Sequence, residues 1–186
     1  MKRVFVIHGW QGTPESHWKP WLKRELGARG FEVFMPQMPN PIFPSINEWV
    51  DTIRNIVGVV DEDTYFVGHS LGCITVVRYL AGLKEGQKVG GVVLVAGFYS
   101  DIGLPEISQF YTNIEEVEKA KQHSNKFVSI VSDNDTSVPL EKAKELNTAL
   151  DGELIIENEK GHFCEEDGVV ELPSALGAIL RISKNS

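Results

Sequence analysis

Short apolar runs alternate with amphipathic stretches along the chain. Runs of strand length lie at residues 3–8, 31–35, 64–68, 90–96, 126–131 and 153–157. Several of them are continuously apolar instead of alternating with polar positions, which is typical of parallel strands covered on both faces. The pattern therefore predicts about six strands in one parallel sheet.

Between these runs, apolar side chains recur at helical spacing. One stripe covers residues 46–60 and follows Ser45 and Glu48, which have the spacing of a capping box. A second stripe covers residues 18–26 and stops at Gly30. Helices are predicted at both stripes, with the tryptophan at position 18 in the core.

Two more helices are expected later in the chain. Residues 114–123 can form a crossover helix, and Pro139 can open a helix that runs to Leu150. Strands that alternate with helices indicate βαβ crossovers, and hence a three-layer α/β/α fold with helices on both faces of the sheet. We expect a single domain over residues 1–186, with ligands bound beyond the carboxyl ends of the strands.

Composition and charge narrow the function classes. The net charge of −8, from 26 acidic and 18 basic residues, repels polyanions, so nucleic acid is not expected as a partner. No apolar stretch is long enough to span a membrane, and the first apolar run is too short for a secretory signal. A cytoplasmic location is therefore expected. Cys73 and Cys164 lack disulfide-scaffold and zinc-site spacing, which favours two reduced thiols.

A nucleophile motif stands between the third predicted strand and a helix. Residues 68–72 read Gly-His-Ser-Leu-Gly, a G-x-S-x-G pattern. A sharp strand-to-helix turn strains the backbone at the serine and leaves no room for side chains two residues away on either side. The turn also exposes the hydroxyl at a helix N-terminus, where developing negative charge is favoured. The pattern predicts Ser70 as a nucleophile.

A serine hydroxyl needs a base, and five histidines are available. His8 and His69 lie at strand ends, and His17 and His123 fall on predicted helices at the surface. His162 follows the last strand, in a loop that can reach back over the sheet edge, so we expect it to be the base.

The imidazole in turn needs an acid to orient it. Asp133 and Asp135 both follow the fifth strand, and the residues alone leave the choice between them open. The order serine, aspartate, histidine is that of α/β-hydrolases.

Acyl transfer also needs two donors for an oxyanion. The amide of Leu71 is one; the second is expected from the loop after the first strand, with Trp10 favoured over Gln11. Gln11, Phe98 and Tyr99 are candidate pocket residues. The connection over residues 97–126 must include a helix and leaves too little chain for a cap domain, so an open pocket that prefers small acyl groups is expected.

These motifs together resemble the α/β-hydrolase superfamily. The matching segments are residues 8–10, 68–72, 135–139 and 161–163. The chain is similar in particular to its compact YdeN-like branch, related to retinoblastoma-binding protein 9, through residues 17–22, 38–41 and 70–73. The resemblance implies strand order 2-1-3-4-5-6, a serine esterase activity without metal or other cofactor, and Asp135 as the acid.

The leading hypothesis is cleavage of a carboxylic ester or related acyl bond through an acyl-Ser70 intermediate. A thioesterase or small amidase would use the same residues. A protein-binding module without turnover is the alternative from another class, although such a module has no need for a nucleophile, base and acid together. A lyase or cofactor-free peroxidase is a minor alternative. A small acyl ester is the expected substrate; no membrane partner is expected, and no sequence feature indicates a protein partner.

Overall fold

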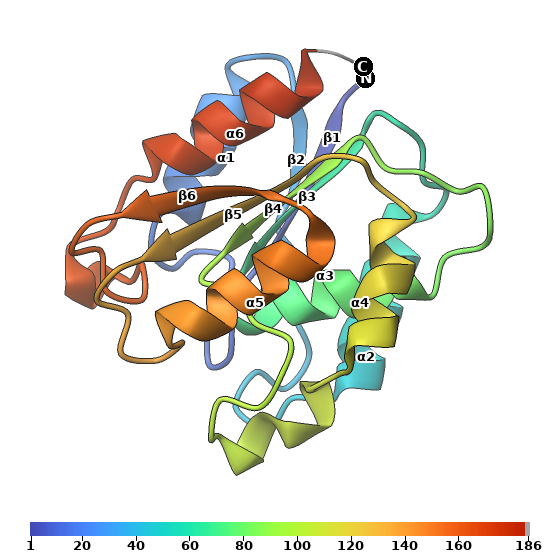
Figure 1. Cartoon of the computed structure of the whole chain (residues 1–186). Coiled ribbons are helices and arrows are strands. Elements are labelled where there is room, and N and C mark those ends of the chain that lie inside the picture. The colour runs from blue at the N-terminus through green and yellow to red at the C-terminus, as the bar shows by residue number, and fades with distance from the viewer. Residues whose placement is uncertain (185–186) are drawn as a thin grey trace.

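The computed structural model describes residues 1–184, which form one six-stranded sheet flanked by helices (Figure 1). Neighbouring strands pair in parallel in the order β2-β1-β3-β4-β5-β6. The strands are β1 (Arg3–Ile7), β2 (Glu32–Phe34), β3 (Thr64–His69), β4 (Gly91–Val95), β5 (Phe127–Ser132) and β6 (Glu153–Glu157). The expected α/β fold and strand order are confirmed.

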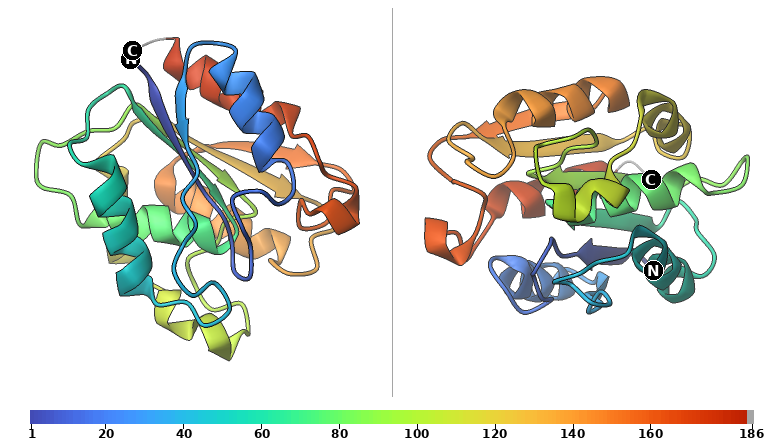
Figure 2. Two further views of the ribbon diagram at one scale, coloured as in Figure 1. Left: turned by 180° about the vertical axis from the view of Figure 1, so that it is seen from behind. Right: turned by 90° about the horizontal axis from the view of Figure 1, so that it is seen from below.

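Helices cover the two faces of the sheet unequally. The helices are α1 (Lys19–Gly27), α2 (Ile46–Val57), α3 (Leu71–Ala81), α4 (Ile114–Lys121), α5 (Leu140–Leu150) and α6 (Pro173–Ser183), with 3₁₀ turns η1 (Pro105–Phe110) and η2 (Glu165–Asp167). Residues of α1 and α6 pack into one core, and residues of α2 to α5 into the other. The left view of Figure 2 shows α1 and α6 on the opposite side of the sheet from α2.

The helix boundaries differ from the sequence expectations at two histidines. His17 lies before α1 with a φ of 62°, because that helix begins only at Lys19, with a proline in its first turn. His123 follows the end of α4 and is buried, where its Nδ1 forms a 2.8 Å hydrogen bond with the carbonyl of Gln87. The prediction that both lie on surface helices is therefore wrong.

The predicted capping box of α2 is also absent. Ser45 is the N-cap residue, but its side chain makes no capping hydrogen bond. Its backbone carbonyl accepts the amide of Trp49 at 3.0 Å, and the amide of Ile46 donates instead to the side chain of Gln109 at 3.3 Å. Gln109 thus accepts an amide of the first turn, although not either of the two amides, those of Ser45 and Glu48, that the capping box would satisfy.

The sheet has two functionally different ends. The N-terminal residues and the end of α6 lie near each other at the amino end of the strands, where Lys2 Nζ donates to the carbonyl of Ser183 (Figure 1). At the carboxyl end lie the loops that follow β1, β3, β4, β5 and β6. Within the described residues, the connection from β4 to β5 holds only η1 and α4, and no cap domain is present. No described helix has the length and apolarity needed to cross a bilayer.

Candidate active site

Ser70 occupies a strained turn between β3 and α3. Its φ of 52° and ψ of −118° are unfavourable for a residue with a side chain, and its amide donates to the carbonyl of Val95 at 2.9 Å. A Cβ on Gly72 would lie 2.3 Å from the carbonyl oxygen of Ile7, and one on Gly68 would lie 2.7 Å from Cα of Cys73. The two glycines are required because the backbone of α3 passes directly against β1 and β3.

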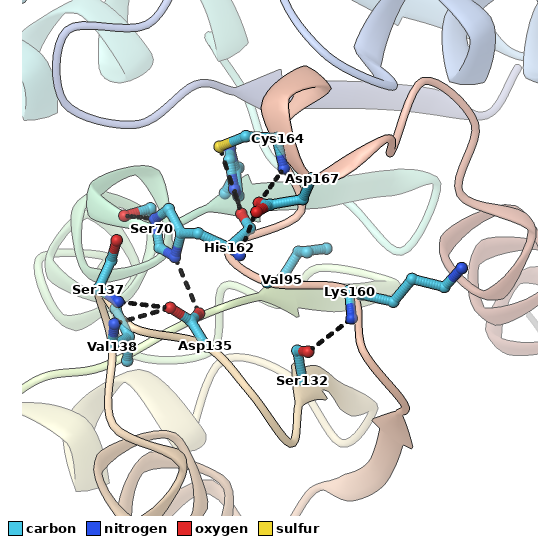
Figure 3. A network of polar contacts seen from close by, with 12 residues as sticks. Ser70, Val95, Ser132, Asp135, Ser137, Val138, Lys160, His162, Cys164 and Asp167 are labelled. Carbon is cyan, nitrogen blue, oxygen red and sulfur yellow. Dashed lines mark hydrogen bonds and ion pairs between the residues drawn. The ribbon is translucent and has the colours of Figure 1, made fainter.

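Three predicted side chains form a continuous hydrogen-bonded row (Figure 3). His162 Nε2 lies 2.9 Å from Ser70 Oγ, and His162 Nδ1 lies 2.8 Å from Asp135 Oδ2. A carboxylate only accepts, so the neutral imidazole carries its proton on Nδ1 and accepts the serine hydroxyl at Nε2. This arrangement can remove a proton from the hydroxyl.

The carboxylate of Asp135 is itself held in place. Its side chain is 3% exposed, and Oδ1 accepts the amides of Ser137 and Val138 at 2.8 and 2.9 Å. Three hydrogen bonds therefore compensate its burial. Asp133 does not reach His162: its Oδ1 accepts the amide of Glu159, in the loop after β6, at 2.8 Å.

Side chains from the loop after β5 fasten the loop that carries His162. Asn134 Oδ1 accepts the amide of Gly161 and the hydroxyl of Ser132, both at 2.8 Å. The hydroxyl oxygen of Ser132 accepts the amide of Lys160 at 3.0 Å (Figure 3). The acid and the base are thus held by the same set of contacts between two loops.

Asp167 stabilises the loop that carries His162 through two hydrogen bonds. Its Oδ2 accepts the amides of His162 and Cys164, at 2.8 and 3.1 Å. Gly161 has a φ of 52°, and a Cβ there would lie 2.1 Å from Asp167 Oδ1. The glycine before the histidine therefore allows this carboxylate to approach the backbone.

A second histidine, His69, contacts the backbone of His162. His69 is 3% exposed, and its Nε2 lies 2.9 Å from the carbonyl oxygen of His162. Burial lowers the pKa of His69 well below its usual value. The ring is therefore neutral, and since a carbonyl only accepts, Nε2 carries the proton and donates it. Sequence reasoning placed His69 only near the site and missed this contact.

Two backbone amides beside Ser70 have no hydrogen-bond partner among the described residues, those of Trp10 and Leu71. The amide of Gln11 donates to the carbonyl of Pro41 at 2.9 Å, so it is not available for an oxyanion. A Cβ on Gly9 would lie 3.0 Å from the Cβ of Ser70, so this glycine lets the first loop approach the serine.

His8 anchors the loop after β1 without reaching Ser70. The ring is fully buried; Nδ1 lies 2.8 Å from the carbonyl of Gly9, and Nε2 accepts the amide of Met38 at 3.0 Å. Burial lowers the pKa of His8 to about 4. The residue is a neutral structural link between two loops.

A cavity of about 460 Å³ opens beside Ser70. Its lining comprises Trp10, Ser70, Leu71, Phe98, Ile102, Leu104, Ile107, Thr136, Ser137, Val138 and His162. Of the three pocket candidates, Phe98 lines it, whereas Gln11 and Tyr99 do not. Tyr99 lies at a separate depression with Ile114 and Glu141.

One group of potential metal ligands lies behind the His162 loop within residues 1–184. The donor atoms of His17, Cys164 and Glu166 lie within 4.8 Å of one another. His17 Nδ1 already accepts the amide of Glu165 at 3.1 Å, so an ion would have to displace that contact or the ring proton. The nearby Lys19 ammonium, which is fully buried, further disfavours a cation there.

Comparisons with known proteins identify relatives of the chain. A family model described as serine hydrolase matches residues 4–180. The Bacillus subtilis (strain 168) protein YdeN, assigned as a hydrolase, is 34% identical over 173 residues, which are 92% of this chain and 91% of YdeN. The crystal structure of the B. subtilis ydeN product has a TM-score of 0.89 at 32% identity and 98% coverage of both chains.

More distant solved structures share the fold alone. Est1E from Butyrivibrio proteoclasticus, solved with ferulic acid bound, has a TM-score of 0.78 at 15% identity, with 100% of this chain and 90% of that one covered. The same three-layer arrangement therefore extends well beyond the YdeN-like relatives.

Proposed function

The chain belongs to the serine hydrolase family, and from this premise we propose that it cleaves a carboxylic ester or related acyl bond through an acyl-Ser70 intermediate. The observation that carries the proposal is the row from Ser70 Oγ through His162 to Asp135, with contacts of 2.9 and 2.8 Å. A serine hydroxyl, an imidazole and a buried carboxylate in this sequence form the machinery of nucleophilic acyl transfer.

In the acylation half, Ser70 Oγ bonds to the acyl carbon while its proton passes to His162 Nε2. Asp135 keeps the proton on Nδ1 and stabilises the imidazolium that forms. The carbonyl oxygen becomes an oxyanion and accepts the amides of Trp10 and Leu71, which are otherwise unpaired among the described residues. Collapse of this intermediate breaks the bond to the leaving group, which takes the proton from His162.

In the deacylation half, water repeats the same steps. His162 Nε2 takes a proton from the water, whose oxygen bonds to the acyl carbon of the acyl-enzyme. The oxyanion again forms at the two amides, and Ser70 Oγ leaves with the proton returned by His162. Carboxylic acid is released and the free enzyme is restored, with no step that uses a metal or an organic cofactor.

An oxygen ester is the bond type favoured over a thioester or an amide. Structural neighbours include carboxylesterases of Nitrososphaera gargenis and an esterase domain from Rhodothermus marinus, although at 14% and 13% identity. A thioester or an amide would be attacked by the same residues, so thioesterase or amidase activity is the alternative at this site.

Active-site labelling tests the proposal. A fluorophosphonate should modify Ser70 alone, as located by peptide mass spectrometry, and Ser70→Ala should remove both labelling and ester hydrolysis. Ser108→Ala, an exposed serine on η1, serves as the matched control and should retain both. Chelators should leave the rate unchanged. Full ester hydrolysis by folded Ser70→Ala would overturn the proposal.

A further inference from the structure

The cavity beside Ser70 is lined by apolar side chains and by uncharged polar ones. Apart from the titratable ring of His162, its polar side chains are the hydroxyls of Ser70, Thr136 and Ser137. No aspartate, glutamate, lysine or arginine contributes to the lining. A charged group on the acyl portion of a substrate would find no partner of opposite sign here.

One wall of the cavity comes from the connection between β4 and α4. Ile102, Leu104 and Ile107 contribute apolar side chains, and Ile107 is 2% exposed. Figure 1 shows this segment, in yellow-green, at the bottom of the view. This wall is therefore formed by one short connecting segment and not by a cap domain.

Hydrogen bonds hold this wall at several points. The hydroxyl of Tyr111 donates to the carbonyl of Leu104 at 2.9 Å and accepts its amide at 3.1 Å. The side chain of Gln109 donates to the carbonyl of Pro44 at 2.8 Å and accepts the amide of Ile46 at 3.3 Å. These contacts fix the wall against itself and against the start of α2, so the cavity exists before a ligand binds.

The other walls are also apolar and anchored. Trp10 Nε1 donates to the carbonyl of Ile42 at 3.0 Å, which orients the indole at the cavity. Phe98 and Val138 are 1% and 2% exposed and are supported by the core. A preformed cavity of about 460 Å³ lies within the range of small-ligand sites and is much larger than an acetyl group needs.

Resting on the proposed function, we propose that this cavity is the acyl site and selects an uncharged apolar acyl group longer than acetyl, with Leu104 in the wall that limits its length. Each methylene that moves from water into the cavity should raise kcat/KM about fourfold, which corresponds to about 0.8 kcal/mol. A carboxylate at the end of the acyl chain should lower it at least ~100-fold, because it would be buried without a partner. This revises the sequence expectation of a preference for small acyl groups.

A series of p-nitrophenyl esters from acetate to decanoate, with the hemisuccinate as the charged member, tests the proposal on the full chain. We expect kcat/KM to rise with acyl length to an optimum beyond butyrate, and the hemisuccinate to be among the poorest substrates. A flat profile, an optimum at acetate or preference for the hemisuccinate would overturn the acyl-site proposal.

Variants at position 104 locate the wall. Leu104→Ala should move the optimum to longer chains, and Leu104→Phe to shorter ones. Ile114→Ala, an apolar side chain that is 41% exposed at the separate depression, is the matched control and should leave the profile unchanged. Equal profiles for all three variants would contradict the assignment of Leu104.

A binding measurement separates this proposal from the proposed function. Calorimetric titration of Ser70→Ala with uncleaved alkyl esters should show affinity rising with acyl length, whether or not turnover occurs. Loss of fluorophosphonate labelling at Ser70 in the native chain would count against the catalytic mechanism alone. Absence of any length dependence in the Ser70→Ala titration, together with normal labelling, would count against the acyl site alone.

Discussion

The two sides of Ser70 are built in opposite ways. On the side of His162, the side-chain oxygens of Ser132 and Asn134, at the end of β5 and just after it, accept backbone amides of the loop after β6. Asp167 accepts the amide of His162 within the connection that follows β6. On the side of the cavity, most of the lining side chains are apolar, and hydrogen bonds hold the wall from outside the lining. Hydrogen bonds require particular atoms at particular distances, whereas apolar packing tolerates swaps of similar volume.

Because of this contrast, we expect the two sides to control different properties, the rate on the polar side and the choice of substrate on the apolar side. A change of one atom on the polar side alters the placement of the base and hence the rate for every substrate. A change of volume on the apolar side alters which substrate fits. We therefore expect substitutions on the polar side to lower kcat uniformly, and those on the apolar side to redistribute kcat/KM among substrates.

The largest effect is expected on the polar side at Asp135. Asp135→Asn should retain the fold but lower kcat ~10⁴-fold, the loss known for a tautomer-fixing aspartate in a serine protease triad. The matched control is Asp133→Asn, because Asp133 forms its hydrogen bonds with the backbone of Glu157 and Glu159 and not with His162. Steady-state kinetics with circular dichroism measures both. If folded Asp133→Asn lost more activity than Asp135→Asn, then Asp133 and not Asp135 would be the acid that orients His162.

On the apolar side, the buried anchor His8 is titratable, and its titration should make the free energy of unfolding depend on pH. Its folded pKa of about 4 lies below the unfolded value of 6.5. Between these two values the unfolded chain binds a proton that the folded chain does not, so the free energy of unfolding falls as pH falls. The loss from this residue should approach about 3 kcal/mol near pH 4.

Denaturant unfolding at a series of pH values measures this effect. His8→Gln keeps an acceptor for the amide of Met38 but does not titrate, so its stability should be lower at pH 7 and fall less between pH 6.5 and 4. An equal fall in both proteins would show that His8 is not the group responsible.

A smaller effect on the polar side is expected at His69. Removing the donor to the His162 carbonyl in His69→Phe should lower kcat by about 100-fold through misplacement of the base, with KM little changed. His69→Gln can present an amide donor near the position of Nε2 and should recover most of the rate. If the two variants lose activity equally, the contact does not position His162.

The smallest effect is expected at Asn134, one contact further from the chemistry. Asn134→Ala removes an acceptor from the amide of Gly161 and the hydroxyl of Ser132. We expect a loss of about 1 kcal/mol in the free energy of unfolding, because the residue is exposed and water can replace its oxygen. Chemical denaturation measures it, and an unchanged midpoint would show that the loops do not depend on this residue.

The fold could be predicted from the pattern of apolar residues, because the spacing of apolar side chains within each segment indicates whether it forms a strand or a helix. The expected runs at 64–68 and 126–131 correspond to β3 and β5 within one residue at each end. The nucleophile turn could also be predicted, because the local backbone of such a turn requires the glycines at positions 68 and 72. Ser70, Asp135 and His162 were placed in loops that the sheet topology brings to one edge.

Contacts between segments that are distant in the sequence could not be predicted in this way. Nothing local to His69 indicates that its ring reaches a carbonyl ninety-three residues later. The cavity wall was missed for a related reason: Ile102 and Leu104 lie in a segment that forms neither helix nor strand, while Tyr99 lines another depression. Side-chain direction in an irregular segment is set by tertiary packing, which no local pattern records.

The contact between the N-terminal residues and the end of α6 at the amino edge of the sheet has a practical consequence for engineering. Arg3 is paired with Thr64, the first residue of β3, whereas Ser70 follows the last, so this edge and the site lie a full strand length apart. Affinity tags or fusion partners at the N-terminus should therefore leave the cavity accessible. A circular permutant with a short linker across the old ends, reopened at the exposed turn around Glu85, should preserve the sheet order and the site.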